Sequence, residues 1–426
     1  MSARDAGRFL RIQRIHALRR LRWDNRLLLL AAAIGLAGGL LAAVYYLVLV
    51  GLTRWIWVTG PLSRWPMPVT CALGGALVGL AVRWLGSPVE ISTVVNNIHL
   101  KEGRLDPRRS PSMAVNSLLS IAFGGSAGPE APLVQICGSL GTWLGDKLRV
   151  RPRVIRTVTL SGMAAALGSF FGAPLGGALF ALEIPHRRGL EYYEALMPAI
   201  LSAAFAFLVL HGLTAAGVHW PFPPHLPPGL RDVGLGLGIG FGLVGAAAAT
   251  LFIALFRTLF RALDRAPLHP VVRGAGGGLL LGLLSWHHPE TLFFSEQQIA
   301  LLFSAHHGAA GWLLLALIKA VAIGVTLGSG FRGGFIFPLF FIGACLGQAM
   351  HAFAPSIDVS LAMLAIMAGI NVGVTKTPIA TTVILVTLSG LSVFPVVLFA
   401  SLASFLATLP IGMIETQASR ARTAEG

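Results

Sequence analysis

The chain of 426 residues is 55% hydrophobic, has charge on only 12% of its residues and has a mean hydropathy of +0.76. Soluble domains carry about 25% charged residues, so this chain lacks the charge that a water-exposed surface requires. The composition excludes a soluble enzyme, a disordered regulator and a nucleic-acid binder, and it predicts a membrane protein. We therefore expect the net charge of +15 to reflect orientation in a lipid bilayer rather than contacts with nucleic acid.

The N-terminal arm, residues 1–26, contains eight arginines ahead of the first long apolar stretch. Arginines clustered before an apolar span hold that end of the chain in the cytoplasm. Phe9, Ile12, Ile15 and Leu18 recur at helical spacing within the arm. The pattern predicts a basic amphipathic helix on the inner membrane surface, and a partly ordered tail is the alternative.

Apolar stretches that cross, or nearly cross, a bilayer run through the whole chain, and several are shorter than the about 20 residues of a full span. Glycine- and proline-rich breaks separate many of them, and such breaks are tolerated at membrane depth only beside protein or a wet cavity. The expected fold class is an all-α polytopic membrane protein of tilted and broken helices. The predicted helices cover residues 27–52, 66–85, 113–124, 131–146, 154–168, 174–184, 191–213, 233–260, 272–286, 311–327, 335–350, 359–372, 378–390 and 393–409.

Basic residues locate the cytoplasmic loops of the first half. Lysines and arginines gather in three loops, at residues 101–109, 147–156 and 187–188. The positive-inside rule places these loops in the cytoplasm. Two helical hairpins are therefore expected to rise from the inner side, with their apices at residues 124–132 and 168–177.

The second half shows the opposite charge pattern. After Arg273 the only lysines and arginines are Lys319, Arg332, Lys376, Arg420 and Arg422. The loops at residues 287–310, 351–358 and 390–395 contain none, so we expect them to be external. The hairpins between them then point inward, with their apices at residues 328–338 and 371–378.

The spacing of the apices agrees with two inverted copies of one unit. Glu130 and Gly334 are 204 residues apart, and so are Pro174 and Pro378. Inverted repeats with broken helices are typical of secondary transporters and related channels. The predicted organisation is an arm (1–26), a first membrane repeat (27–213), a proline-rich connector (214–232), a second, inverted repeat (233–410) and a short tail (411–426).

The broken apices have the features of an anion site. A helix start exposes unpaired N–H groups and the positive end of its dipole, glycine lets a ligand approach the backbone, and proline fits the first turn. Convergence of the four helix starts would make such a site. The candidate ligands are Gly128, Pro129, Gly333, Gly334, the backbone of Phe335 and Ile336, and the hydroxyls of Ser87, Ser126 and Ser329.

Glu130 is the first candidate for a functional side chain. A carboxylate at membrane depth is costly and is by default a functional hypothesis. At a helix start built for anions, it can occupy the anion site and leave when protonated, which predicts a gate or a proton carrier. Stabilisation of its own helix dipole is the alternative.

Three segments resemble the CLC family of chloride channels and proton-coupled chloride antiporters, in the family's order and over about residues 30–410. They are Gly128-Pro-Glu-Ala-Pro132, the stretch from Gly168 to Glu183, and Gly328-Ser-Gly-x-x-Gly-Gly-x-x-x-Pro338. The resemblance implies a homodimer in the plasma membrane with one anion path per subunit, and chloride as the transported partner. It implies that Glu130 is the external gate, that the amides of Phe335 and Ile336 coordinate the anion, and that Ser87 is its hydroxyl ligand. Because the chain stops about 15 residues after its last apolar stretch, we expect no cytoplasmic CBS domains.

Three departures from the family pattern bear on proton coupling and selectivity. Ile184, next to Glu183, stands where the resemblance places the internal proton-transfer glutamate of the antiporters. The anion-coordinating tyrosine near the last helix has no counterpart, and Arg332 stands at an apex where many members are uncharged. We expect transport of an anion, first of all chloride, with proton coupling open. The alternatives are a proton-coupled antiporter and an exporter of another anion such as fluoride.

A different class of function is an intramembrane serine hydrolase. Gly124-Gly-Ser-Ala-Gly128 matches the nucleophile pattern Gly-x-Ser-x-Gly, with Ser126 as nucleophile. Catalysis would need a base within reach, and His99 and His186 fall in the predicted cytoplasmic loops. We therefore expect no enzyme activity.

The remaining polar residues predict no cofactor and no metal site. Lys319 and Lys376 are candidates to attract anions, to pair with an acid or to extend toward the membrane surface. Glu90 and Asp146 are expected to stabilise helix ends. Solvated loop histidines and cysteines without metal spacing account for the others, at positions 287, 288, 306 and 307 and at positions 71, 137 and 345.

Overall fold

The computed structural model describes residues 3–417 apart from residues 89, 191, 215–219, 221, 223–229 and 266, and it describes side chains there except at residues 3–24, 153 and 230–234. The first half contains α1 (Ala3–Arg54), α2 (Met67–Leu85), α3 (Ile91–Leu100), α4 (Ser110–Ala122), α5 (Glu130–Lys147), α6 (Pro152–Phe170), α7 (Pro174–Glu183) and α8 (Leu196–Thr214). The second half contains α9 (Leu230–Asp264), α10 (Pro270–Leu284), α11 (Glu296–Leu301), α12 (Ala309–Gly328), α13 (Ile336–Phe353), α14 (Val359–Thr375), α15 (Pro378–Ser389) and α16 (Phe394–Ala407). Short 3₁₀ or π turns lie at Trp55–Thr59, Pro61–Arg64, Pro107–Arg109, Tyr193–Ala195, Pro289–Thr291 and Leu391–Val393.

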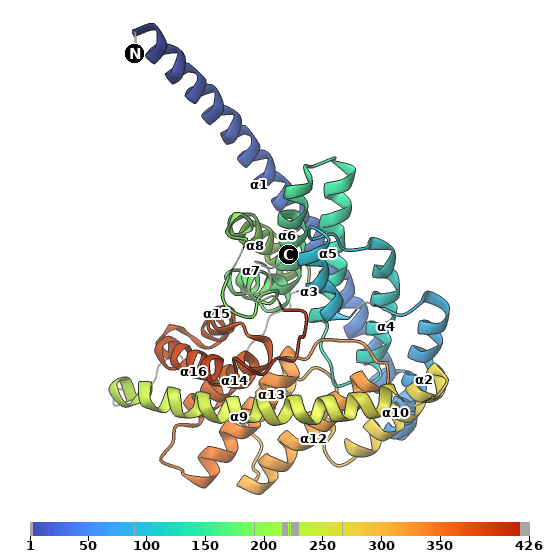
Figure 1. The fold of residues 1–426 in the computed structure, drawn as a ribbon. Helices are drawn as coiled ribbons and strands as arrows, with labels where there is room; N and C mark the ends of the chain where they lie inside the picture. The colour runs from blue at the N-terminus through green and yellow to red at the C-terminus, as the bar shows by residue number, and fades with distance from the viewer. Residues whose placement is uncertain are drawn as a thin grey trace.

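The predicted all-α class is confirmed (Figure 1). Each predicted apolar stretch coincides with one helix, whereas α3 and α11 were not predicted. Helix α1 runs without a break through the predicted boundary between residues 26 and 27. Most of the predicted connector and residues 418–426 of the predicted tail lie outside the described residues.

Proline and glycine explain several of the helix boundaries. Helices α6, α7, α10 and α15 each begin with a proline, whose fixed φ suits the first turn and whose missing N–H is not needed there. Helix α15 ends at Ser389 and is followed by Gly390, whose φ of 105° is one that residues with a side chain rarely adopt. Proline at the helix starts and glycine after the helix ends thus limit the length of helices such as α7 and α15, as the inverted-repeat plan requires.

Each half packs around its own helices, and two helix pairs join the halves. In the first half α6 contacts α1, α5 and α8, and in the second half the long α9 lies along α12, α14 and α16 (Figure 1). Helix α2 packs on α10, and α7 packs on α15. The α2–α10 contact depends on Gly75 and Gly274, because a Cβ on either would overlap the backbone of the other.

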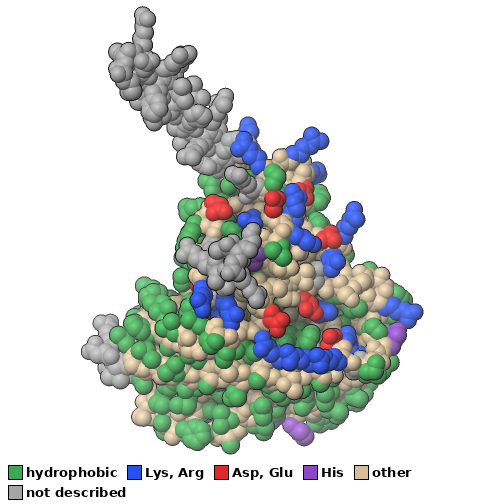
Figure 2. All heavy atoms as spheres, in the orientation of Figure 1, with side chains coloured by type: hydrophobic (Ala, Val, Ile, Leu, Met, Phe, Trp, Pro, Cys, Tyr) green, Lys and Arg blue, Asp and Glu red, His purple; other side chains and the backbone are tan. Residues whose placement is uncertain are grey.

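The described residues include six helices long and apolar enough to cross a membrane: Asn25–Thr59, Met67–Leu85, Tyr193–Thr214, Leu235–Asp264, Ala309–Gly328 and Ile336–Phe353. Shorter apolar helices accompany them. Hydrophobic side chains cover much of the broad lower part of the molecule, whereas Lys and Arg gather on its upper part (Figure 2). These features are those of a multi-pass membrane protein.

Candidate functional site

The apices of the two repeats meet in a short antiparallel bridge between Gly128 and Gly334. Gly128 N donates to Gly334 O at 2.7 Å, and Gly334 N donates to Gly128 O at 2.5 Å. The bridge places the start of α5 beside the start of α13. The two segments that the sequence singled out are therefore brought together in one site.

Glu130 is the first residue of α5, and its side chain is seated on the start of α13. Its Oε1 accepts a hydrogen bond from Phe337 N at 3.0 Å, and the residue is 2% exposed. Oε2 is buried and has no hydrogen-bond partner among the described residues. The carboxylate thus occupies the position at a helix N-terminus that suits a small anion.

Phe337, which supplies that amide, is held by a cluster of aromatic rings. Its ring lies 5.5–6.2 Å, centroid to centroid, from those of Phe170, Phe171, Phe294, Trp220 and Phe340. Such edge and tilted contacts add to the packing energy of buried rings. The amide that holds Glu130 is therefore fixed rather than adaptable.

A small cavity, which we call the chamber, adjoins the Glu130 seat. It has a volume of about 20 Å³, enough for one water-sized species. Three helix starts reach it: Ile91 of α3, Glu130 of α5, and Phe335 and Ile336 at α13. Helix α7 contributes only its C-terminal half, through Phe180 and Ile184, and α15 contributes none of the described lining residues. Of the four helix starts expected to converge, two do so, and α3 supplies a third that was not predicted.

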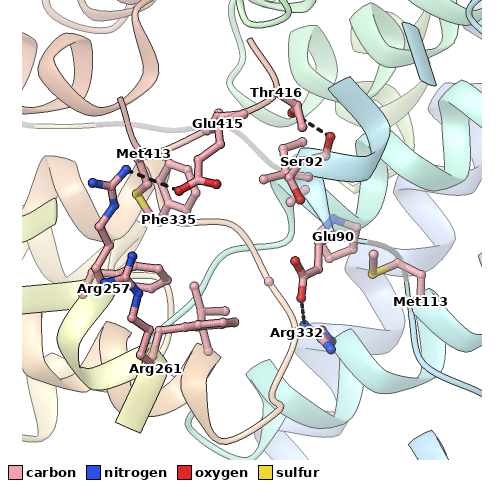
Figure 3. A pocket seen from close by; sticks show the side chains of 18 residues that line it. Glu90, Ser92, Met113, Arg257, Arg261, Arg332, Phe335, Met413, Glu415 and Thr416 are labelled. Carbon is pink, nitrogen blue, oxygen red and sulfur yellow. Dashed lines mark hydrogen bonds and ion pairs between the residues drawn. The ribbon is translucent and has the colours of Figure 1, made fainter. Parts of the chain in front are cut away.

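A larger cavity of about 430 Å³, which we call the vestibule, lies next to the chamber (Figure 3). Ile91, Ala131 and Phe335 line both cavities, so they form the constriction between them. Three arginines and two glutamates also line the vestibule: Arg257, Arg261, Arg332, Glu90 and Glu415. The vestibule therefore carries one more positive than negative side chain, and its lining is continuous with that of the chamber, which Glu130 lines.

Of the three predicted serine ligands, Ser87, Ser126 and Ser329, none lines the chamber. Ser87 is exposed and lies before α3, because Gly86, with a φ of 82°, turns the chain at the end of α2. Ser126 is buried in the first-half apex, where its backbone N–H donates to Thr326 Oγ1 at 3.1 Å. Its own Oγ has no hydrogen-bond partner among the described residues, so no base is in place to activate it. The geometry gives the hydrolase alternative no support.

Glu183 and Ile184 take different positions at the end of α7. The two carboxylate oxygens of Glu183 accept hydrogen bonds from Ile379 N at 3.1 Å and Ala380 N at 2.8 Å. Glu183 therefore caps the start of α15 and satisfies its unpaired amides. Ile184 lines the chamber with an apolar side chain that cannot carry a proton.

The two buried lysines, Lys319 and Lys376, donate hydrogen bonds to backbone carbonyls. Lys376, in a left-handed conformation at the end of α14, donates from Nζ to Gly373 O, Thr408 O and Thr408 Oγ1 at 2.6–2.7 Å. Lys319 donates to the carbonyls of Thr291 and Phe293 at 2.9 and 2.8 Å. Neither lines the chamber or the vestibule, so of the cations at the second-half apices only Arg332 lines one of the two cavities.

Residues 409–417 form a strap that crosses the vestibule side of the molecule and that the sequence did not reveal. Arg187 donates to the carbonyls of Leu409 and Pro410, and Arg257 donates to Gly412 O. The strap ends at Gln417, whose Nε2 donates to Ile184 O and Thr375 O at 2.9 and 2.8 Å. It closes one wall of the vestibule and ties together helices from both repeats.

Glu296, at the start of α11 in the segment between α10 and α12, is an ionisable group near the site that the sequence did not single out. Its carbonyl accepts a hydrogen bond from Trp220 Nε1 at 3.1 Å, and Trp220 packs on the Phe337 ring. Burial raises the pKa of the Glu296 carboxyl to about 7, and repulsion by Glu130 adds to the shift.

Comparison with protein families matches residues 74–409 to the family described as voltage gated chloride channel. The chain belongs to this family. Two relatives are a chloride/fluoride channel protein of Pseudomonas syringae pv. tomato, 31% identical over 97% of this chain and 90% of its own, and a putative ion-transport protein, YfeO, of Escherichia coli, 27% identical over 81% and 84%. The sequence predicted an anion-transporting membrane protein of the CLC family, and these matches confirm that prediction.

Solved structures share the fold. A CLC-type fluoride/proton antiporter superposes with a TM-score of 0.81 at 24% identity, covering 92% of this chain and 98% of its own. A slow cyanobacterial Cl⁻/H⁺ antiporter gives a TM-score of 0.78 at 21% identity, covering 90% and 94%. The inverted-repeat architecture expected from the sequence is thereby confirmed as that of the family.

Proposed function

We propose that the protein moves a small halide across the membrane along a path from the vestibule, through the constriction and the chamber, to Glu130. The observation that carries the proposal is the hydrogen bond from Phe337 N to Glu130 Oε1 at 3.0 Å. The carboxylate sits where a transported anion would accept the same hydrogen bond. It therefore acts as a gate, and protonation weakens its competition with the anion.

The energetics favour a site built from backbone amides. Burial of a bare ion in hydrocarbon costs tens of kcal/mol by the Born estimate, whereas one helix terminus returns up to about 2 kcal/mol. Direct hydrogen bonds must therefore replace the water that the anion loses. The starts of α3, α5 and α13, which line the chamber together, are the available donors.

Chloride is the first candidate for the transported halide and fluoride is the second. Fluoride is supported by the relative named as a chloride/fluoride channel protein and by the fluoride/proton antiporter that shares the fold. Proton exchange is a further candidate, because the two solved neighbours described above are named as proton antiporters. Within the chamber lining, Glu130 is the carboxylate available to carry a proton, since Ile184 is apolar.

The proposal includes an orientation and an assembly. The arginine-rich loops and the N-terminus lie in the cytoplasm, so the vestibule opens to the cytoplasm of the cell. The protein resides in the plasma membrane and functions as a homodimer with one path in each subunit, as the CLC resemblance implies. A single flux experiment can decide whether transport is coupled to protons, whereas it does not test the homodimer.

The experiment is halide release from proteoliposomes loaded with chloride or fluoride, with external halide and pH recorded together. We expect release of at least one halide, and Glu130→Gln and Glu130→Ala should retain release while losing its dependence on pH. Glu194→Gln, which alters an exposed carboxylate in the 3₁₀ turn Tyr193–Ala195, is the matched control and should behave as the wild type. Release of neither halide would contradict the proposal, and halide movement that drives protons would establish the antiporter.

A further inference from the structure

An ion pair between Arg332 and Glu90 lies on the vestibule side of the constriction. Arg332 precedes Gly333 at the second-half apex, and Glu90 precedes Ile91 at the start of α3. Their side chains meet at 3.6 Å between Nη1 and Oε1 (Figure 3). Because Ile91 and Phe335 form the constriction, the pair stands at the point where an anion leaves the vestibule for the chamber.

The Arg332 guanidinium is under-satisfied in this arrangement. It offers five N–H donors, but its carboxylate contact is longer than a hydrogen bond. Its Nε is buried and has no partner among the described residues. The backbone at Arg332 is nevertheless fixed, because its N–H donates to Ser120 Oγ at 2.8 Å. A positioned guanidinium with unused donors is a suitable ligand for an anion.

The start of α3 adds a second positive group beside Arg332, so the place that Glu90 occupies also suits another anion. Helix α3 begins at Ile91, directly after Glu90, so the positive end of its dipole lies beside the pair, although the Thr93 N–H already donates to Glu90 O at 3.0 Å. The side chain of Glu90, in the cap position, makes no capping hydrogen bond and is 52% exposed. It is therefore free to move away from Arg332, whose side chain is only 18% exposed.

We propose that Arg332 and the first turn of α3 form an inner anion site, and that Glu90 occupies it when no anion is bound. Glu90 is then an inner carboxylate gate, just as Glu130 is the outer one. An arriving halide takes the guanidinium donors and Glu90 swings into the vestibule. The inference rests on the proposed anion transport and adds a binding site to it.

The test is the halide concentration that gives half-maximal flux in Glu90→Gln and Arg332→Gln, measured beside the melting temperature of each purified variant. Glu90→Gln removes the competing carboxylate and should lower that concentration. Arg332→Gln removes the guanidinium and should raise the concentration about tenfold, which corresponds to the loss of one hydrogen bond from a charged donor. Arg332→Lys, which keeps the charge and loses the fork, should fall between the wild type and Arg332→Gln. Arg261→Gln, which removes a vestibule arginine with no carboxylate partner among the described residues, should shift it less.

Opposite shifts in the two variants of the pair support the inner site. A structural latch would instead lower the melting temperature in both variants and shift the half-maximal concentration in the same direction, which would overturn the proposal. An Arg261→Gln effect as large as that of Arg332→Gln would also overturn it, because the vestibule would then act only through its total charge. If the wild type releases neither halide, calorimetric titration of the purified variants with chloride and with fluoride still decides whether the inner site exists.

Discussion

The substitution Gly128→Ala should open the anion path by displacing Glu130 from its seat. A Cβ at Gly128 would overlap Oε2 of Glu130 and lie 2.5 Å from Cδ and 2.6 Å from Oε1, and these are its three nearest neighbours. Because all three belong to the far end of one flexible side chain, Glu130 must rotate away while the backbone stays in place. The rotation breaks the hydrogen bond from Phe337 N. A charged hydrogen bond of this kind contributes about 1.5–3 kcal/mol, so the seated population should fall by about tenfold to a hundredfold.

The assay is halide release from proteoliposomes over a range of pH. Gly128→Ala should release halide faster than the wild type, with the pH dependence largely lost, and the Gly128→Ala/Glu130→Ala double variant should match Glu130→Ala alone. Gly276→Ala is the control, because an added Cβ there meets nothing within 4 Å. A folded Gly128→Ala protein that kept the wild-type pH dependence would refute the reasoning that the seated carboxylate is the gate.

Three further substitutions test the supports around the path. Lys319→Met should lower the free energy of unfolding by about 3 kcal/mol, since it leaves two buried carbonyls without their donor, whereas the exposed Lys147→Met should change the melting temperature little. Glu296→Gln should raise the melting temperature at pH 8 and raise it less at pH 5. A carboxyl whose pKa is raised by folding destabilises the protein as pH rises from 4.5 through about 7, so the substitution should increase the free energy of unfolding at pH 8 by at most about 3 kcal/mol. Gln417→Ala should free the strap by removing two buried hydrogen bonds, which limited proteolysis of the C-terminus detects; unchanged cleavage would show that the strap is held elsewhere.

The sequence predicted the architecture well because the bilayer restricts what an apolar chain can form. Long apolar stretches with proline starts and glycine stops have few alternatives to helices at membrane depth, and their order and spacing showed the repeat. The same reasoning located the two apices that the Gly128–Gly334 bridge joins. Glu130 stood out because an unshielded carboxylate in such a place is costly.

The site was less predictable where function depends on how short segments turn. Helix α3 has only ten residues, with Asn96, Asn97 and His99 in its second half, so apolar length did not reveal it, and its cap residue Glu90 is not one of the usual signals of a helix start. Ser87 was expected at the anion from the family resemblance, and it does not line the chamber, because Gly86 turns the chain at the end of α2. Partners such as Glu90 for Arg332, or Gln417 for Ile184, are 242 and 233 residues apart in sequence. No local pattern indicates such pairs.

The bridge between Gly128 and Gly334 also determines when the path can exist during synthesis. Its two residues are 206 positions apart, so the first repeat leaves the ribosome and enters the membrane long before its partner is made. Until the second apex arrives, the seat of Glu130 has no Phe337 amide and the chamber lacks one side. A nascent or truncated chain therefore has no complete route for ions.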